Sequence, residues 1–90
     1  MSQVDITVQG TPNPNAAKFV VSGTSLGTSS RSYFGADEAG DDDLAIRLFG
    51  VDGVRALLIV DNFITVTKTD EVAWDDIVED IRWIIGEALG

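Results

Sequence analysis

The chain has 90 residues, of which 15 are acidic and 6 basic, so its formal net charge at pH 7 is −9. It contains neither cysteine nor histidine, which excludes disulfides, thiolate metal sites and the usual proton shuttle near neutral pH. The length and a hydrophobic fraction of 44% predict a single globular domain over residues 1–90. With no signal-peptide pattern and no long apolar run in the sequence, we expect a cytoplasmic protein.

The negative charge also restricts the partners that the sequence favours. The six basic residues are scattered and never adjacent, so no local basic patch opposes the overall negative field. Such a field repels nucleic acid and anionic membrane surfaces. We therefore expect no nucleic-acid or membrane partner, a monomeric chain, and protein partners that are neutral or basic.

The N-terminal part predicts two short strands around a rigid connection. Apolar and polar residues alternate over residues 4–9, and this period of two is typical of a half-buried strand. Pro12 and Pro14 restrict the backbone of the connection, residues 10–15. A second strand is predicted at residues 18–22.

A Gly/Ser/Thr-rich stretch follows at residues 23–30, and its composition predicts a mobile loop. Residues 31–35 could pair briefly as an extra edge strand. The acidic residues 41–43 precede an apolar helical stripe and supply an N-cap with favourable charge for the helix dipole. This short helix ends before Gly50, which we expect in the left-handed conformation just after the helix. The stripe consists of Leu44, Ala45, Leu48 and Phe49.

Two strand-like runs, residues 54–60 and 63–68, flank the dipeptide Asp61-Asn62 and predict a hairpin. A two-residue connection pairs Val60 with Phe63 and sets the register of the other pairs. One face of the hairpin then consists of large branched aliphatic residues, and we assign this face to the helices: Leu57, Ile59, Ile64 and Val66. The opposite face carries Leu58 and Phe63.

The last predicted element is an amphipathic helix over residues 73–89. Eight residues follow its i, i+3, i+4, i+7 spacing: Trp74, Ile77, Val78, Ile81, Ile84, Ile85, Ala88 and Leu89. Because Trp74 is the largest residue of this stripe, we expect its ring to be buried between helix and sheet, near Ile64 or Val66. Trp83 lies nine positions further, about 180° around the helix, and should point away from the core.

The predicted order is strand, strand, helix, strand, strand, helix. Amphipathic helices packed on one face of a mostly antiparallel sheet make an α+β fold of two layers. We therefore predict a two-layer β-β-α-β-β-α domain with two helices on one face of the sheet.

Two motifs stand near opposite ends of the chain. They are Thr11-Pro12-Asn13-Pro14-Asn15 and Phe63-Ile64-Thr65-Val66-Thr67-Lys68, and Trp74 follows the second. In this order the motifs resemble the N-terminal domain of the Nfu/NifU-type iron–sulfur scaffold proteins. The resemblance covers nearly the whole chain and implies a small α/β domain, which agrees with the elements predicted from periodicity.

The resemblance also implies a place in iron–sulfur cluster biogenesis. In that family a second, C-terminal domain carries Cys-x-x-Cys, and two such thiolate pairs from two chains would ligate a bridging cluster. This sequence has no cysteine, so we expect a stand-alone chain without that domain, unable to ligate a cluster through its own thiolates. What the resemblance carries over is an accessory, protein-recognition role without a cofactor, with iron–sulfur assembly components as candidate partners.

An alternative function is the binding or delivery of iron or another divalent metal by carboxylates. Asp75/Glu79 and Asp76/Asp80 have i, i+4 spacing, and the acidic residues 41–43 add further oxygen atoms. Oxygen ligands suit hard cations, whereas iron sites usually include histidine or cysteine. The spacing of an EF-hand is also absent. We favour solvated acidic faces and helix caps, and we assign no metal ligand.

The sequence predicts a protein that is not an enzyme. Its serine and aspartate residues lack the base that a catalytic triad requires, and Gly50-x-x-Gly53 is too short for a phosphate-binding loop. Paired carboxylates could cleave glycosides only within a deep cleft, which a chain of this length rarely forms. We assign no catalytic residue.

Three residues are candidate anchors for a protein partner: Trp83, Leu58 and Phe63. Exposed tryptophan is enriched in binding hot spots, and the other two lie on the sheet face assigned away from the helices. The alternatives are that Trp83 lies flat along its helix or under a loop, and that residues 23–30 or the N-terminal segment cover the sheet face. For the segment from Thr11 to Asn15 we favour a rigid turn over a recognition loop.

Overall fold

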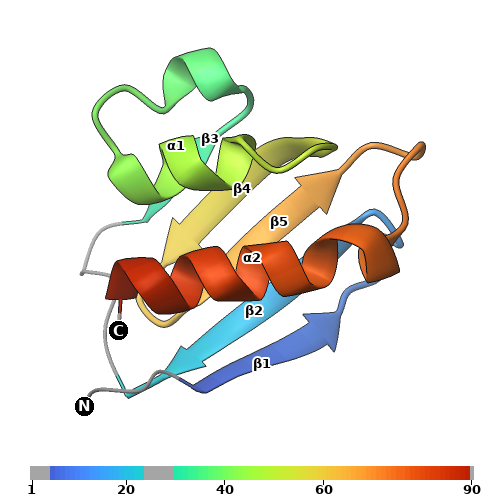
Figure 1. Ribbon diagram of the computed structural model, residues 1–90, viewed down its shortest axis with the longest axis horizontal. Helices are drawn as coiled ribbons and strands as arrows, with labels where there is room; N and C mark the ends of the chain where they lie inside the picture. Colours follow the sequence, from blue (N-terminus) through green and yellow to red (C-terminus); the bar gives the residue numbers. More distant parts are fainter. Residues whose placement is uncertain (1–4, 24–29, 90) are drawn as a thin grey trace.

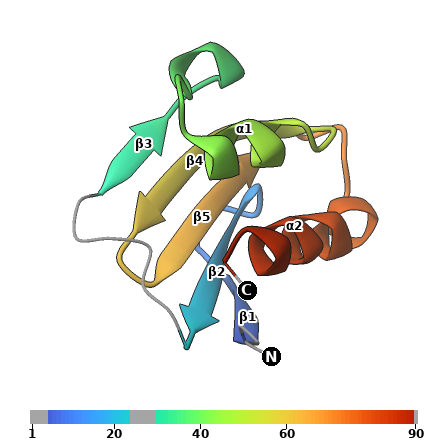
Figure 2. The ribbon, with the colours of Figure 1, turned by 60° about the vertical axis from the view of Figure 1, so that its left-hand side comes forward.

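The computed structural model describes residues 5–23 and 30–89. In this part of the chain, a five-stranded antiparallel sheet carries two α-helices on one face (Figures 1 and 2). The strand order is β1-β2-β5-β4-β3, so the β1–β2 pair and the predicted β4–β5 hairpin join through β2 and β5. The predicted two-layer α+β class is confirmed. The elements are β1 (Asp5–Gly10), β2 (Ala16–Ser22), β3 (Arg31–Tyr33), the 3-10 turn η1 (Ala36–Glu38), α1 (Asp43–Phe49), β4 (Val54–Val60), β5 (Phe63–Lys68) and α2 (Trp74–Leu89).

The β4–β5 hairpin has the predicted register and the predicted faces. Val60 pairs with Phe63 and Ile59 pairs with Ile64, as the two-residue connection requires. The face assigned to the helices is buried, with exposed fractions of 2% or less for Leu57, Ile59, Ile64 and Val66. Because a slip of one residue would turn these aliphatic side chains to solvent, burial of this face holds the register.

The tentative edge strand at residues 31–35 is confirmed for Arg31–Tyr33, which pairs with β4. The predicted mobile loop at residues 23–30 lies, except for its first and last residue, outside the described residues. The same holds for Val4, which begins the first predicted strand.

Residues of α2 form the centre of the core. Ile77, Ile81 and Ile85 are each 3% exposed or less, and they pack with the buried residues of α1 and the sheet. Ala88, expected in the same stripe, is exposed near the end of the helix. The side chain of Leu89 lies outside the described residues.

α1 begins as predicted but ends differently. Asp42 is its N-cap, and the Asp42 side chain accepts a hydrogen bond from the amide of Ala45. Gly50 has a right-handed conformation (φ −70°), so the predicted left-handed residue is wrong at this position. In the connection that follows α1, the glycine with a positive φ is Gly53, three residues later (φ +93°), where the chain turns into β4. A 3-10 bond from the Gly50 amide to the Arg47 carbonyl tightens the helix end instead.

Charge divides along the two layers. The strands β2, β3, β4 and β5 contain no aspartate or glutamate and four of the six basic residues, whereas α2 alone carries five carboxylates and one arginine. The helix layer is therefore acidic, and the sheet is neutral to basic. In the described part of the chain, no helix is long and apolar enough to cross a membrane.

Candidate functional site

The loop of Thr11–Asn15, called here the Pro-Asn loop, is fastened to the end of β5. The ammonium group of Lys68 donates to Asn15 Oδ1 at 3.0 Å and to the Thr69 carbonyl at 3.1 Å. The Lys68 amide donates to the Asn15 carbonyl at 2.8 Å, and the Asn15 side-chain amide donates to the Asp70 carboxylate. The two sequence motifs, far apart in the chain, therefore meet in space.

The Pro-Asn loop is also held by its own side chains. The Thr11 hydroxyl donates to the Ala16 carbonyl at 2.9 Å, and Asn13 Oδ1 accepts from the Asn15 amide at 2.9 Å. Such local bonds make this segment a rigid turn, as the sequence predicted.

Trp74 closes this contact from the side of α2, and it is not the buried core residue that the sequence predicted. Its ring is half-buried, and its Nε1 donates to the Pro14 carbonyl at 3.0 Å. The ring packs against Phe19 with centroids 6.3 Å apart, and the Lys68 ammonium lies 5.7 Å from its centroid. The indole N–H needs a hydrogen-bond acceptor, which an aliphatic core does not offer. The Pro14 carbonyl at the edge of the core provides one. We call the contacts of Lys68 and Trp74 with the Pro-Asn loop the clasp.

A cleft of about 300 Å³ lies beside the clasp. The residues around it come from β1, the Pro-Asn loop, the start of β2 and the first turns of α2. Val8 of β1 is 40% exposed there, and none of the described residues that line the cleft is charged. Its size and apolar lining suit an aliphatic side chain, and it offers no group for acid–base or nucleophilic chemistry.

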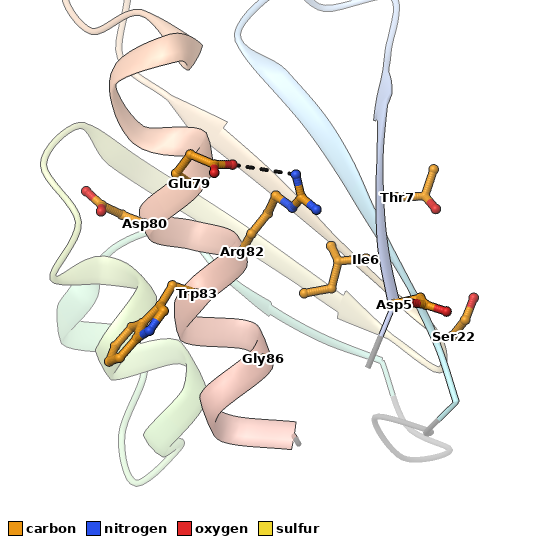
Figure 3. A pocket seen from close by; sticks show the side chains of 9 residues that line it. All are labelled: Asp5, Ile6, Thr7, Ser22, Glu79, Asp80, Arg82, Trp83 and Gly86. Atoms are coloured by element: carbon orange, nitrogen blue, oxygen red, sulfur yellow. Dashed lines mark hydrogen bonds and ion pairs between the residues drawn. The ribbon is translucent and has the colours of Figure 1, made fainter. Parts of the chain in front are cut away.

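Trp83, the first of the three predicted anchors, is exposed as expected, at 67%. It belongs to a shallow hollow of about 900 Å³ that spans the outer side of α2 and reaches β1 (Figure 3). From α2, Glu79 and Arg82 extend toward β1 and form an ion pair at 3.5 Å, whereas Asp80 and Trp83 extend away from β1. Asp80 and Trp83 also line a smaller hollow of about 330 Å³ against the end of α1.

The third candidate surface is the face of the sheet that carries no helix. Leu58 is 37% exposed on this face, and Phe63 is half-buried beneath the Lys18 ammonium, which lies 4.2 Å from the ring centroid. Leu58 and Phe63 alternate along their strands with the buried Leu57, Ile59 and Ile64, so they lie on the face opposite the helices, as predicted. Residues 24–29 and 1–4, from the other expected cover, are outside the described part.

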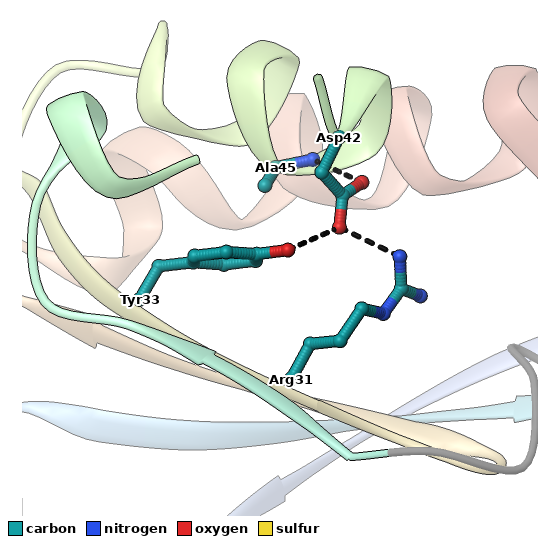
Figure 4. A network of polar contacts seen from close by, with 4 residues as sticks. All are labelled: Arg31, Tyr33, Asp42 and Ala45. Carbon is teal, nitrogen blue, oxygen red and sulfur yellow. Dashed lines mark hydrogen bonds and ion pairs between the residues drawn. The ribbon is translucent and has the colours of Figure 1, made fainter. Parts of the chain in front are cut away.

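A polar network that sequence reasoning missed joins β3 to the start of α1 (Figure 4). Asp42 Oδ2 accepts from the Arg31 guanidinium at 2.6 Å and from the Tyr33 hydroxyl at 2.9 Å. Burial, then the neighbouring Asp42 carboxylate, raises the pKa of Tyr33 above its ordinary value of 10.0. The i, i+2 spacing of Arg31 and Tyr33 places both on one face of a strand, which is the signal that could have revealed this network.

The paired carboxylates proposed as an alternative metal site are exposed along α2: Asp75, Asp76, Glu79 and Asp80. Within residues 5–23 and 30–89, no group of three or more acidic side chains is arranged to hold a metal ion. Glu79 is engaged by Arg82. Sequence reasoning also missed two exposed apolar residues, Phe34 at 77% and Ile46 at 49%; Ile46 could have been found because it lies off the apolar stripe of α1.

Comparison with known proteins identifies relatives over nearly all of the chain. The family model described as "Scaffold protein Nfu/NifU N terminal" matches residues 6–90. NifU-like protein 5 from Arabidopsis thaliana is 34% identical over 89% of this chain and 29% of its own length. The human NFU1 iron-sulfur cluster scaffold homolog is 36% identical over 84% of this chain and 30% of its own length. The chain therefore spans less than a third of either relative.

The fold is similar to that of a solved member of this group. The solution structure of a NifU-like protein from Saccharomyces cerevisiae superimposes with a TM-score of 0.78 at 30% identity, covering 92% of this chain and 76% of that one.

Proposed function

The chain belongs to the Nfu/NifU N-terminal family, and from this membership we propose that it is a non-enzymatic protein-interaction module of iron–sulfur cluster biogenesis. Its human relative is named as an iron–sulfur cluster scaffold homolog. The sequence has neither cysteine nor histidine, the residues that usually ligate clusters. In this proposal the cluster is cargo held by the thiolates of other proteins, and this domain recognises one of those proteins.

The observation that carries the proposal is the sheet face that neither helix covers. It exposes Leu58 and, beneath Lys18, the ring of Phe63, without a carboxylate in the four strands from β2 to β5. Desolvated apolar and aromatic side chains supply most of the affinity of protein interfaces. A single domain with such a face, and with no assembled catalytic group in its described part, is suited to binding.

The proposal includes a cytoplasmic, monomeric protein that binds neither nucleic acid nor membranes. The net charge of −9 supports the last two parts of this proposal and the monomeric state, because it opposes binding to polyanions and disfavours association between two copies. A carboxylate-based role in metal delivery gains no supporting observation from the described residues.

Direct binding to purified iron–sulfur assembly components from the same organism tests this function. Wild-type protein should bind a cysteine desulfurase, a cluster scaffold or a cluster-receiving protein in a titration followed by calorimetry. Leu58→Ser and Phe63→Ala should each weaken binding at least threefold, as expected for contact anchors. Ile46→Ser is the matched control, because it removes an exposed aliphatic side chain from the helix layer.

Two results would contradict the proposal at different points. If the wild-type protein binds none of these components, the function is wrong. If it binds but both sheet variants retain full affinity, the sheet face is not the interface. Thermal unfolding of each variant shows whether the fold survives the change.

A further inference from the structure

The smaller hollow beside Trp83, between the end of α1 and the middle of α2, combines an exposed aromatic ring with two carboxylates. Its volume is about 330 Å³, and Trp83, Asp52 and Asp80 lie on its wall. We infer that this hollow binds an arginine side chain of a basic segment in a partner protein. The inference rests on the proposed interaction function for the existence of a partner, but it names a different surface and a specific chemistry.

The aromatic part of the hollow is presented by α2. Trp83 is 67% exposed, and Asp80 precedes it by one helical turn, so both extend from the same side of the helix (Figure 3). A side chain with this exposure makes little contribution to the core. It leaves an indole face available for a planar cation, and tryptophan is the most favourable ring for this contact.

The acidic part of the hollow has no partner of its own in the described chain. Asp52 and Asp80 are exposed, and neither takes part in an ion pair among residues 5–23 and 30–89. Arg47, the only basic residue among the described residues of the wall, is held at 3.1 Å by Asp43 on its own helix. Both carboxylates therefore remain available to a cation from a partner.

Arginine fits this arrangement better than lysine. Its guanidinium is planar, stacks on an indole and donates several hydrogen bonds in a fixed fork, so one group can satisfy Trp83 and a carboxylate together. The surrounding charge favours the same ligand, because the hollow lies in the acidic helix layer of a chain with net charge −9. The field should also hasten the encounter with a basic segment.

A peptide titration followed by NMR tests the inference without any knowledge of the natural partner. The probe is a capped Gly-Arg-Gly-Arg-Gly peptide, and its matched control contains citrulline, the neutral isostere of arginine. The arginine peptide should shift the indole N–H signal of Trp83 in a saturable manner, and the citrulline peptide should bind at least fivefold more weakly. Raising the ionic strength from 20 to 200 mM, which shortens the screening length from about 20 to about 7 Å, should weaken binding of the arginine peptide only.

Variants distinguish a specific hollow from general attraction to a negative protein. Trp83→Ala should weaken the arginine peptide at least threefold, and the double variant Asp52→Asn/Asp80→Asn at least fivefold. The control Glu71→Gln/Asp75→Asn removes the same charge from exposed positions just before and at the start of α2, outside the hollow, and should change affinity less than twofold. For the Trp83 variant, the amide signals of Asp80 and Asp52 report binding in place of the indole.

The inference is overturned if citrulline binds as well as arginine, or if the two double variants lose equal affinity. It is also overturned if the arginine peptide shifts signals of the sheet face and leaves those of Trp83, Asp52 and Asp80 unchanged. These outcomes are independent of the calorimetric test with assembly components. A failed peptide titration leaves the proposed function standing, and a failed search for an assembly partner leaves the arginine site standing.

Discussion

The two tryptophans lie nine residues apart on α2 and have opposite surroundings. Trp74 is half-buried at the start of the helix, where its ring packs on Phe19 and its N–H is bonded to Pro14. Trp83 is 67% exposed, on the side of the helix that faces solvent and the end of α1. The helical periodicity predicted the exposure of Trp83 correctly, whereas Trp74, predicted to be buried, is half-buried at the edge of the core.

The contrast teaches that the residues of the two sequence motifs serve mainly the structure. The clasp joins the two motifs through hydrogen bonds made by Asn15, Lys68 and Trp74. Because these polar groups already have partners within the chain, few of them remain for a partner protein. Of the three candidate anchors, Trp83 and Leu58 belong to neither motif, whereas Phe63 is the first residue of the second motif.

The largest expected effect is at Trp74. Trp74→Ala removes a half-buried ring and one hydrogen bond and should lower the free energy of unfolding by roughly 2–3 kcal/mol, below the 3–5 kcal/mol typical of a fully buried aromatic. Trp74→Phe, which retains an aromatic ring, should lose only about 1 kcal/mol. Urea unfolding followed by circular dichroism measures both changes.

Trp83→Ala is the matched control for this comparison. Because the side chain of Trp83 is exposed, its removal should change the free energy of unfolding by no more than about 0.5 kcal/mol. Equal losses at the two tryptophans would show that the clasp does not stabilise the fold.

A steric test at the same end of the molecule should have the next largest effect. Gly53 has φ +93°, and a Cβ atom there would lie 2.7 Å from a methyl carbon of Val72, in the segment that leads to Trp74. Gly53→Ala should therefore cost about 2 kcal/mol, from backbone strain and the displaced segment. The double variant Gly53→Ala/Val72→Ala removes the nearest methyl carbon but retains the Cβ atom of residue 72, 3.0 Å from the added Cβ. It relieves part of the contact, so its loss should fall short of the sum of the two single losses. Strict additivity would assign the effect to the backbone and not to the methyl groups of Val72.

Removing the charged group of the clasp should have a smaller effect. Lys68 is 7% exposed, and its ammonium has two oxygen acceptors. Lys68→Met keeps the apolar stem but loses these bonds, and we expect a loss of about 1 kcal/mol. The matched change Lys18→Met, on the more exposed side of the sheet, should cost less than about 0.5 kcal/mol. Chemical denaturation at pH 7 gives the change in the free energy of unfolding for both variants. A larger loss for Lys18→Met than for Lys68→Met would contradict the stabilising role assigned to Lys68.

The smallest expected effect concerns the contact of Tyr33 with Asp42 at the start of α1, the helix that forms one wall of the Trp83 hollow. It tests whether polar contacts hold α1 in place, as they hold the Pro-Asn loop. The pKa of Tyr33 is raised above 10.0 by burial and by the Asp42 carboxylate, so folding favours the protonated phenol. This contribution is fully present below pH 10 and is lost as the pH rises through the higher pKa of the folded state. Melting temperatures measured from pH 8 to 11 should therefore fall more steeply for wild type than for Tyr33→Phe. Parallel curves would remove the role assigned to the phenol.

The sequence alone determined the class and most elements of this fold. The hairpin register of residues 54–68 and the helical stripe of residues 74–89 predicted most of the side chains that these elements bury, including Ile59, Ile64 and Ile81. These features are readable because the spacing of apolar residues within one element decides which face can leave water. The exposure of Trp83 follows from the same rule.

Only the tertiary structure decided how the elements meet. Asn15 lies 53 residues from Lys68, and Pro14 lies 60 residues from Trp74, so no local pattern indicates that their polar atoms will be partners. The same limit applies to the hollow that places Asp52 near Trp83. Periodicity assigns a residue to a face of its own element but does not identify its neighbour on another element. Trp74 lies at the edge of the core because its indole N–H bonds to the Pro14 carbonyl, and only the folded chain brings these two groups together.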